Sequence, residues 1–200
     1  MRRRQVLAAC SALPVALAGC PSRRSSPTDS PATATKQAPF DSCRDSDVSR
    51  PEPSAPEWEA AIQPMAYPTA PPTPLDEQSA IEYVQWFEEA YRQNRQIRED
   101  RDADSKFVSF SVGTIETWTY DAPPGAAVVR LEHTWSGRFE SRSQDGGGHY
   151  DSVPHFASYY VDQSMVVRTA VSQYDVSDGD TLSPDPWESG ELVACFDTSE

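Results

Sequence analysis

Apolar residues recur at helical spacing between residues 76 and 97. Four of them fall at i, i+4, i+7 and i+11 and share one helix face: Ala80, Val84, Phe87 and Tyr91. Asp76 suits the N-cap position, because its carboxylate accepts the free N–H groups of the first turn. Glu88 and Arg92 form an i,i+4 pair, which the pattern places on the other, polar faces of the helix. The apolar face predicts a helix that packs on a core.

From residue 107 onward the apolar period changes to two, which is typical of strands. The predicted strands cover residues 107–120, 127–139, 156–161, 165–173 and 192–196. Gly113 predicts a bulge in the first strand, and Asp162–Ser164 predicts a hairpin turn between the third and fourth strands. One helix followed by about five antiparallel strands is an α+β arrangement, in which a curled sheet wraps the helix. By element order it resembles cystatin-like and nuclear-transport-factor-like folds, which host many functions.

Composition divides the chain into three parts. Residues 1–19 are expected to be a signal peptide, and residues 20–74 a disordered linker rich in Pro, Ser and Thr. Residues 75–200 form the α+β domain. Within the linker, Trp58 to Ile62 is a small apolar island, which we interpret as docking on the domain.

The first twenty residues have the features of a lipoprotein signal. Arg3 and Arg4 precede a short apolar stretch, a pattern that resembles the twin-arginine export signal. That stretch is too short to span a bilayer of about 30 Å. Residues 17–20 read Leu-Ala-Gly-Cys and resemble a lipobox, in which Cys20 receives the lipid. Together the two motifs predict export and attachment to the extracellular face of the cell membrane through Cys20.

The charge of the chain excludes one class of partner. The net charge is −14, and removal of residues 1–19 takes away three arginines and no acid, which leaves −17. A surface this acidic repels phosphate backbones, so we expect no nucleic-acid partner. It also repels anionic lipid headgroups, so the membrane attachment is expected to be covalent. Only Lys36 and Lys106 are lysines, and an acid-rich, lysine-poor chain suits a protein that stays soluble in strong salt.

Four cysteines are present, and two have other expected fates: Cys10 lies in the signal peptide and Cys20 carries the lipid. An even remainder outside the cell favours a disulfide between Cys43 and Cys195, with two free thiols as the alternative. Such a bond would fix Cys43 to the last predicted strand.

Two groups of side chains are candidate cation ligands. His149, Asp151 and His155 lie close together in the sequence, and imidazole and carboxylate groups suit zinc or copper. Their spacing matches no compact ligand motif, so ordinary surface histidines are the competing interpretation. Asp175, Asp178 and Asp180 partly match a calcium loop but lack its terminal glutamate at the proper spacing. No cofactor is expected.

The chain contains no nucleophile elbow, phosphate-binding loop or dinucleotide fingerprint, so the sequence gives no positive indication of an enzyme. Aromatic residues on the strands either line a cavity in the sheet or belong to the core. The feature that would favour a site inside the curled sheet is a deep pocket that combines His133 or Trp135 with polar groups.

The signal motifs, the acidic lysine-poor composition and residues 66–95 together resemble small lipoproteins of halophilic archaea. The last segment is a proline-rich lead-in followed by a helix of the form Tyr-Val-x-x-Phe-Glu-x-Ala-Tyr-x-x-Asn. This resemblance implies a habitat and a cellular location, and it assigns no residue beyond Cys20. The leading hypothesis is a surface lipoprotein whose domain binds a ligand or partner without catalysis. The alternatives are an enzyme or small-molecule carrier with its site in the concave sheet, and a protein that binds divalent cations through its acidic loops.

Overall fold

The computed structural model describes residues 37–99, 105–141, 147–172 and 181–196. The first two elements are a short 3-10 helix, η1 (Asp45–Asp47), and the long helix α1 (Glu77–Glu99). Six strands follow: β1 (Ser105–Tyr120), β2 (Ala127–Ser141), β3 (Gly147–Asp151), β4 (His155–Val161), β5 (Met165–Ser172) and β6 (Glu191–Cys195). A single helical turn, α2 (Pro186–Ser189), precedes β6.

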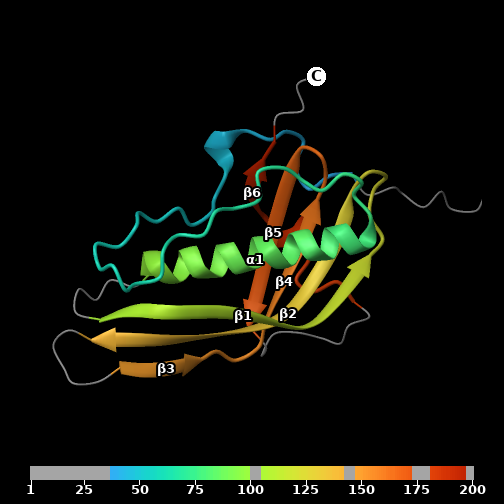
Figure 1. Ribbon diagram of the computed structural model, residues 1–200. Coiled ribbons are helices and arrows are strands. Elements are labelled where there is room, and N and C mark those ends of the chain that lie inside the picture. Colours follow the sequence, from blue (N-terminus) through green and yellow to red (C-terminus); the bar gives the residue numbers. More distant parts are fainter. Residues whose placement is uncertain (1–36, 100–104, 142–146, 173–180, 197–200) are drawn as a thin grey trace, which may run out of the picture. The chain divides into compact units, whose positions relative to one another are not determined.

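The strands form one antiparallel sheet in the order β1-β2-β4-β5-β6, and β3 pairs with the outer half of β2. The sheet curls, and α1 lies along its concave face (Figure 1). The predicted α+β class, with one helix packed on a curled antiparallel sheet, is therefore confirmed. The predicted hairpin between β4 and β5 is also present.

Helix α1 begins where the sequence predicts. The Asp76 carboxylate accepts the backbone N–H of Ser79 at 2.9 Å, and the Ser79 hydroxyl accepts the backbone N–H of Asp76 at the same distance. These two bonds satisfy donors that the first helical turn leaves free. Hydrogen bonds from the backbone N–H and the hydroxyl of Ser79 hold the pKa of the Asp76 carboxyl below its usual range.

The core lies on both faces of the sheet. On the concave face, the four residues of the predicted helix stripe are all buried, together with Val129, Leu131 and Tyr159 of the sheet. On the other face, Tyr160 and Val167 pack against residues from both ends of the described chain, including Phe40, Leu182 and Trp187. Strand β4 is buried nearly throughout because both of its faces are covered.

The linker expected over residues 20–74 differs from the structure in its second half. From residue 37 onward the chain packs on the domain: Ser49 N–H donates to the Leu192 carbonyl at 2.7 Å, and Ile62 N–H donates to the Phe107 carbonyl at 2.8 Å. The Asn94 side chain exchanges two 2.8 Å hydrogen bonds with the Met65 backbone. These bonds tie residues 37–74 to β6, β1 and α1, so this part of the expected linker belongs to the domain.

Local details of the sheet also differ from expectation. The irregularities of β1 lie between Phe107 and Ser109 and between Thr114 and Glu116, and the predicted bulge at Gly113 is absent from this described strand. Strand β3 and the turn α2 were not predicted, because β3 begins in a glycine run and α2 lies in an acidic, proline-containing segment.

Candidate functional site

The predicted pair of cysteines is confirmed as a disulfide. Cys43 and Cys195 are joined, with their Cα atoms 5.5 Å apart. The bond lies beside the hydrogen bond between Ser49 and Leu192, so the residues around Cys43 run along β6. Residues Arg3, Arg4 and Cys20 lie outside the described residues.

The three candidate metal ligands do not converge. His149 Nε2 lies 3.1 Å from Asp151 Oδ1 on exposed β3, whereas His155 begins β4 and pairs with His133. Across the described residues, no group of three or more His, Cys, Asp or Glu side chains is placed to hold a metal ion. The three acids of the candidate calcium loop fall within residues 173–180, outside the described part of the chain.

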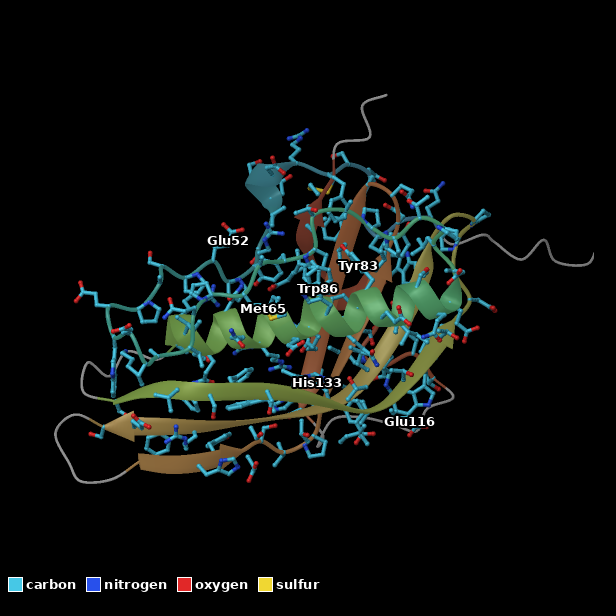
Figure 2. The ribbon with its side chains drawn as sticks, viewed as in Figure 1. Glu52, Met65, Tyr83, Trp86, Glu116 and His133 are labelled. Carbon is cyan, nitrogen blue, oxygen red and sulfur yellow. A yellow bond between two sulfur atoms is a disulfide. The ribbon has the colours of Figure 1, made fainter. Side chains whose placement is uncertain are left out.

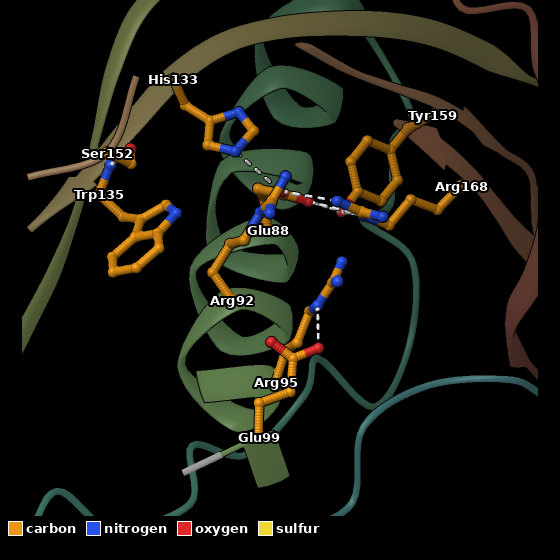
Figure 3. Close-up of polar contacts among 9 residues, drawn as sticks. All are labelled: Glu88, Arg92, Arg95, Glu99, His133, Trp135, Ser152, Tyr159 and Arg168. Atoms are coloured by element: carbon orange, nitrogen blue, oxygen red, sulfur yellow. Dashed lines mark hydrogen bonds and ion pairs between the residues drawn. The ribbon is translucent and has the colours of Figure 1, made fainter. Parts of the chain in front are cut away.

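A concentrated group of charges lies buried between α1 and the sheet (Figure 3). Glu88 is 1% exposed. Its Oε1 accepts hydrogen bonds from Arg92 Nε at 2.7 Å and from an Arg168 terminal nitrogen at 2.9 Å. Its Oε2 accepts from Arg168 Nε at 2.8 Å and from the Tyr159 hydroxyl. This group, which we call the Glu88 network, joins one helix to β4 and β5.

The sequence pattern placed Glu88 and Arg92 on the polar faces of the helix, and that expectation is wrong. Both are buried, because Arg168 and Tyr159 from the sheet complete the shell of the carboxylate. Arg168 also lies over the ring of Tyr91, 3.9 Å from its centroid. The aromatic face and the carboxylate together compensate the buried guanidinium.

Burial and charge act in opposite directions on the pKa values of Glu88 and Arg168. Burial alone would raise the pKa of the Glu88 carboxyl, but Arg168 and Arg92 outweigh it and hold that pKa well below its usual range. Burial would lower the pKa of Arg168, but the Glu88 carboxylate raises it above its usual value. Burial and the neighbouring carboxylate both raise the pKa of the Tyr159 hydroxyl. Glu88 and Arg168 therefore stay ionised at neutral pH, and the Tyr159 hydroxyl stays protonated.

Two histidines lie at one side of this network. His133 is fully buried, and its Nε2 lies 3.0 Å from Glu88 Oε1, a charge-pairing distance without the direction of a hydrogen bond. Its Nδ1 has no hydrogen-bond partner among the described residues. The His155 ring stacks on it with centroids 6.0 Å apart. Burial, Arg92 and His133 lower the pKa of His155 to about 4.

The Glu88 network has the residue types of an acid–base site, but its side chains are not accessible to a reactant. The exposed fraction of His133 is 0%, and those of Tyr159 and Arg168 are 0% and 6%. Figure 2 places His133 between α1 and the sheet, whereas Trp86, 49% exposed, lies on the opposite side of the helix. A reactant would have no path to this carboxylate in the described conformation. The arrangement fits a role in holding α1 on the sheet.

A pocket open to solvent lies where three segments meet, at the C-terminal end of α1. Its cavity volume is about 370 Å³. It is lined by the lead-in before α1, the last turns of α1 and the start of β1: Ser54, Pro56, Glu57, Trp58, Ala61, Ile62, Gln96, Ile97, Lys106 and Phe107. We call it the lead-in pocket. Its volume falls in the lower part of the range of small-molecule sites.

Three other surface pockets of the described chain are poorer candidates. One lies beside Cys195 and is lined mainly by charged residues of the segment 45–52. One lies between Trp86 and the prolines at 68 and 72, and one lies near the N-terminal end of α1; both are more open to solvent. Neither His133 nor Trp135 lines any of these pockets or the lead-in pocket. A deep pocket that combines His133 or Trp135 with polar groups would have favoured a site inside the curled sheet. None of these four pockets is of that kind.

The lead-in pocket was missed by sequence reasoning, since six of its ten lining residues belong to the expected linker. The apolar island from Trp58 to Ile62 was the available signal, and its interpretation as a docking element agrees with the structure. Sequence patterns do not reveal that the island would meet Ile97 and Phe107.

Comparisons with known proteins add no assignment. No protein-family model, curated protein or solved structure matches the chain. The likeness of element order to cystatin-like and nuclear-transport-factor-like folds therefore stays an interpretation. Among the described residues, no helix is long and apolar enough to cross a membrane.

Proposed function

We propose that the protein is an exported lipoprotein, held at the outer face of the cell membrane by a lipid on Cys20, whose α+β domain binds a small ligand without catalysis. The lead-in pocket is the observation that supports the binding role. It combines apolar side chains with polar groups at one accessible place, as ligand sites commonly do.

The filled interface between α1 and the sheet favours this proposal over an enzyme or carrier with its site in the concave sheet. Phe87, Leu131 and Tyr159 close the core around the Glu88 network. The polar groups that such a site would use already bind one another, so they are not free to bind a substrate.

Binding is tested with the neutral apolar fluorophore N-phenyl-1-naphthylamine. We expect saturable fluorescence enhancement by the folded protein and a dissociation constant raised about tenfold by Trp58→Ala, which removes the aromatic wall. Trp86→Ala is the matched control, since Trp86 is an exposed tryptophan of α1 that does not line the lead-in pocket. Absence of enhancement, or equal loss in both variants, would remove the lead-in pocket as the binding site.

The anchor is tested separately in cells. We expect Cys20→Ser to release the protein from the membrane fraction, whereas Cys10→Ser leaves it attached, because Cys10 lies in the segment expected to be removed. Replacement of Arg3 and Arg4 by lysines is expected to stop export. A Cys20→Ser protein that stays in the membrane fraction would disprove the anchor.

A further inference from the structure

Strand β1 forms one edge of the described sheet, because β2 is the only described strand that pairs with it. Other parts of the chain contact the two ends of β1. Ile62 N–H donates to the Phe107 carbonyl, and the Thr119 hydroxyl donates to the Glu77 carboxylate at 3.0 Å. Between these ends, residues 109–115 are exposed or half-buried. We call them the edge segment.

The pairing of β2 shows which backbone groups of the edge segment point outward. Trp135 lies opposite Val112, and its N–H and C=O both bond to Ser152, on the side away from β1. In an antiparallel pair, two opposite residues either exchange both hydrogen bonds or both point away from each other. Val112 therefore directs its N–H and C=O away from β2. Phe110 and Thr114 do the same, because the register is regular between them.

The edge segment lacks the usual protection of an edge strand. Natural edges commonly carry charged residues or proline, which discourage pairing with another chain. The edge segment reads Ser-Phe-Ser-Val-Gly-Thr-Ile and contains neither. Its last residue, Ile115, is 54% exposed. The two register shifts of β1 lie at the ends of the segment, so a partner strand meets one regular stretch with a defined register.

The charge and symmetry of the edge segment favour a second copy as its partner. The chain carries a net charge of −14, but the edge segment carries none. A basic peptide would find no opposite charge along it, whereas a second copy brings an identical uncharged edge. A two-fold axis at Val112 places Val112 opposite Val112 of the second copy and Phe110 opposite its Thr114. Each of these pairs exchanges two backbone hydrogen bonds, and aromatic and β-branched side chains pair favourably across strands.

We infer that the edge segment is a homodimer interface, through which two copies of this chain pair antiparallel and join their sheets. This association is independent of the lead-in pocket. A single strand pair covers less surface than a standard interface, so we expect a dissociation constant of about 100 µM. Both copies are acidic, so salt favours the dimer by screening their repulsion.

The test is sedimentation equilibrium of the mature chain, residues 20–200, with Cys20→Ser so that no lipid is present. We expect the mass to approach twice the monomer mass at about 1 mM protein, and the dissociation constant to be about tenfold lower in about 2 M than in about 0.1 M NaCl. A chain that stays monomeric under all these conditions would overturn the inference. Weaker association at high salt would also overturn it, since opposite charges would then hold the copies together.

A proline substitution assigns the interface to the edge segment. Val112→Pro removes an N–H that the dimer needs, and a strand tolerates proline where its N–H faces solvent. His149→Pro is the matched control on the other edge strand, β3. Gly137 directs its backbone groups toward Tyr150, so the neighbouring His149 points its N–H to solvent. We expect Val112→Pro to be monomeric and His149→Pro to dimerise normally; undiminished dimerisation of Val112→Pro would overturn the inference.

Amide hydrogen exchange of the unsubstituted edge segment gives a second readout, which does not depend on the folding of a variant. When the concentration rises from about 20 µM to about 1 mM, we expect the N–H groups of Phe110, Val112 and Thr114 to exchange about threefold more slowly. Those of Ser111 and Gly113 point toward β2 and should keep their rates. Equal slowing at all of these positions, or slowing at none, would overturn the strand pairing.

Discussion

Neutralising Glu88 should be among the most damaging single changes in the domain. Glu88→Gln preserves side-chain volume but turns one carboxylate oxygen into an amide NH₂ group. That group cannot accept the hydrogen bonds that Arg92 and Arg168 now donate, and a buried guanidinium loses its counter-charge. Removal of one partner from a buried ion pair costs about 3–5 kcal/mol. We therefore expect the free energy of unfolding to fall by about that amount.

The assay is urea denaturation followed by tryptophan fluorescence, supported by thermal melts. For a domain of this size the expected loss corresponds to a melting temperature lowered by about 10 °C or more. Glu82→Gln is the matched control, because Glu82 is exposed on the same helix and surface substitutions usually change stability by about 0.5 kcal/mol or less. If Glu88→Gln costs no more than Glu82→Gln, the Glu88 network does not hold α1 on the sheet.

Three further predictions concern the same interior and the disulfide. Tyr159→Phe removes a hydroxyl that donates to the Glu88 carboxylate, and we expect urea denaturation to show a loss of about 1.5–3 kcal/mol; no loss would exclude that bond. In the mature protein, reduction of the bond between Cys43 and Cys195, 152 residues apart, is expected to cost up to about 5 kcal/mol and to release two alkylatable thiols by mass spectrometry. Thiols that react before reduction in that mature protein would contradict the bond. The depressed pKa of His155, about 4 against 6.5 when unfolded, gives stability that is complete above pH 6.5 and is lost as the pH falls toward 4. His155→Asn should flatten that part of the stability profile, and an unchanged slope between pH 6.5 and 4 would show that another group titrates there.

The helix and the strands could be predicted from the sequence, because the patterns that indicate them involve residues close together in the chain. The period of the α1 stripe, the Asp76 cap and the hairpin between β4 and β5 each depend on residues close together in the chain. The disulfide could be predicted by elimination, since only two cysteines had no other expected role.

The Glu88 network could not be predicted from local sequence signals, because its members come from positions far apart in the chain. Glu88 and Arg92 form a pattern that suits an exposed helix face equally well, and Arg168 is 80 residues from Glu88. One signal was present: Arg168 stands alone in the otherwise apolar and hydroxyl-bearing strand β5. A single guanidinium in such a strand requires a buried counter-charge, and Glu88 supplies it.

The lead-in pocket shows a second limit of sequence reasoning. Composition marked residues 20–74 as a linker, because prolines and hydroxyl residues dominate there. Composition averages over the few residues that bind the domain, such as Ile62 and Met65, whose backbone groups pair with β1 and α1. A few hydrogen bonds of the backbone and a few apolar side chains are enough to place such a segment.

The disulfide also decides which part of the chain bears mechanical load. A pull that enters at the N-terminal end and leaves at the C-terminal end reaches Cys43, crosses the sulfur bridge to Cys195 and bypasses the polypeptide between them. Helix α1, the sheet and the lead-in pocket all lie inside this covalent loop. In an oxidised molecule the disulfide therefore carries this force, whereas in a reduced molecule the same force acts on the hydrogen bonds of the fold.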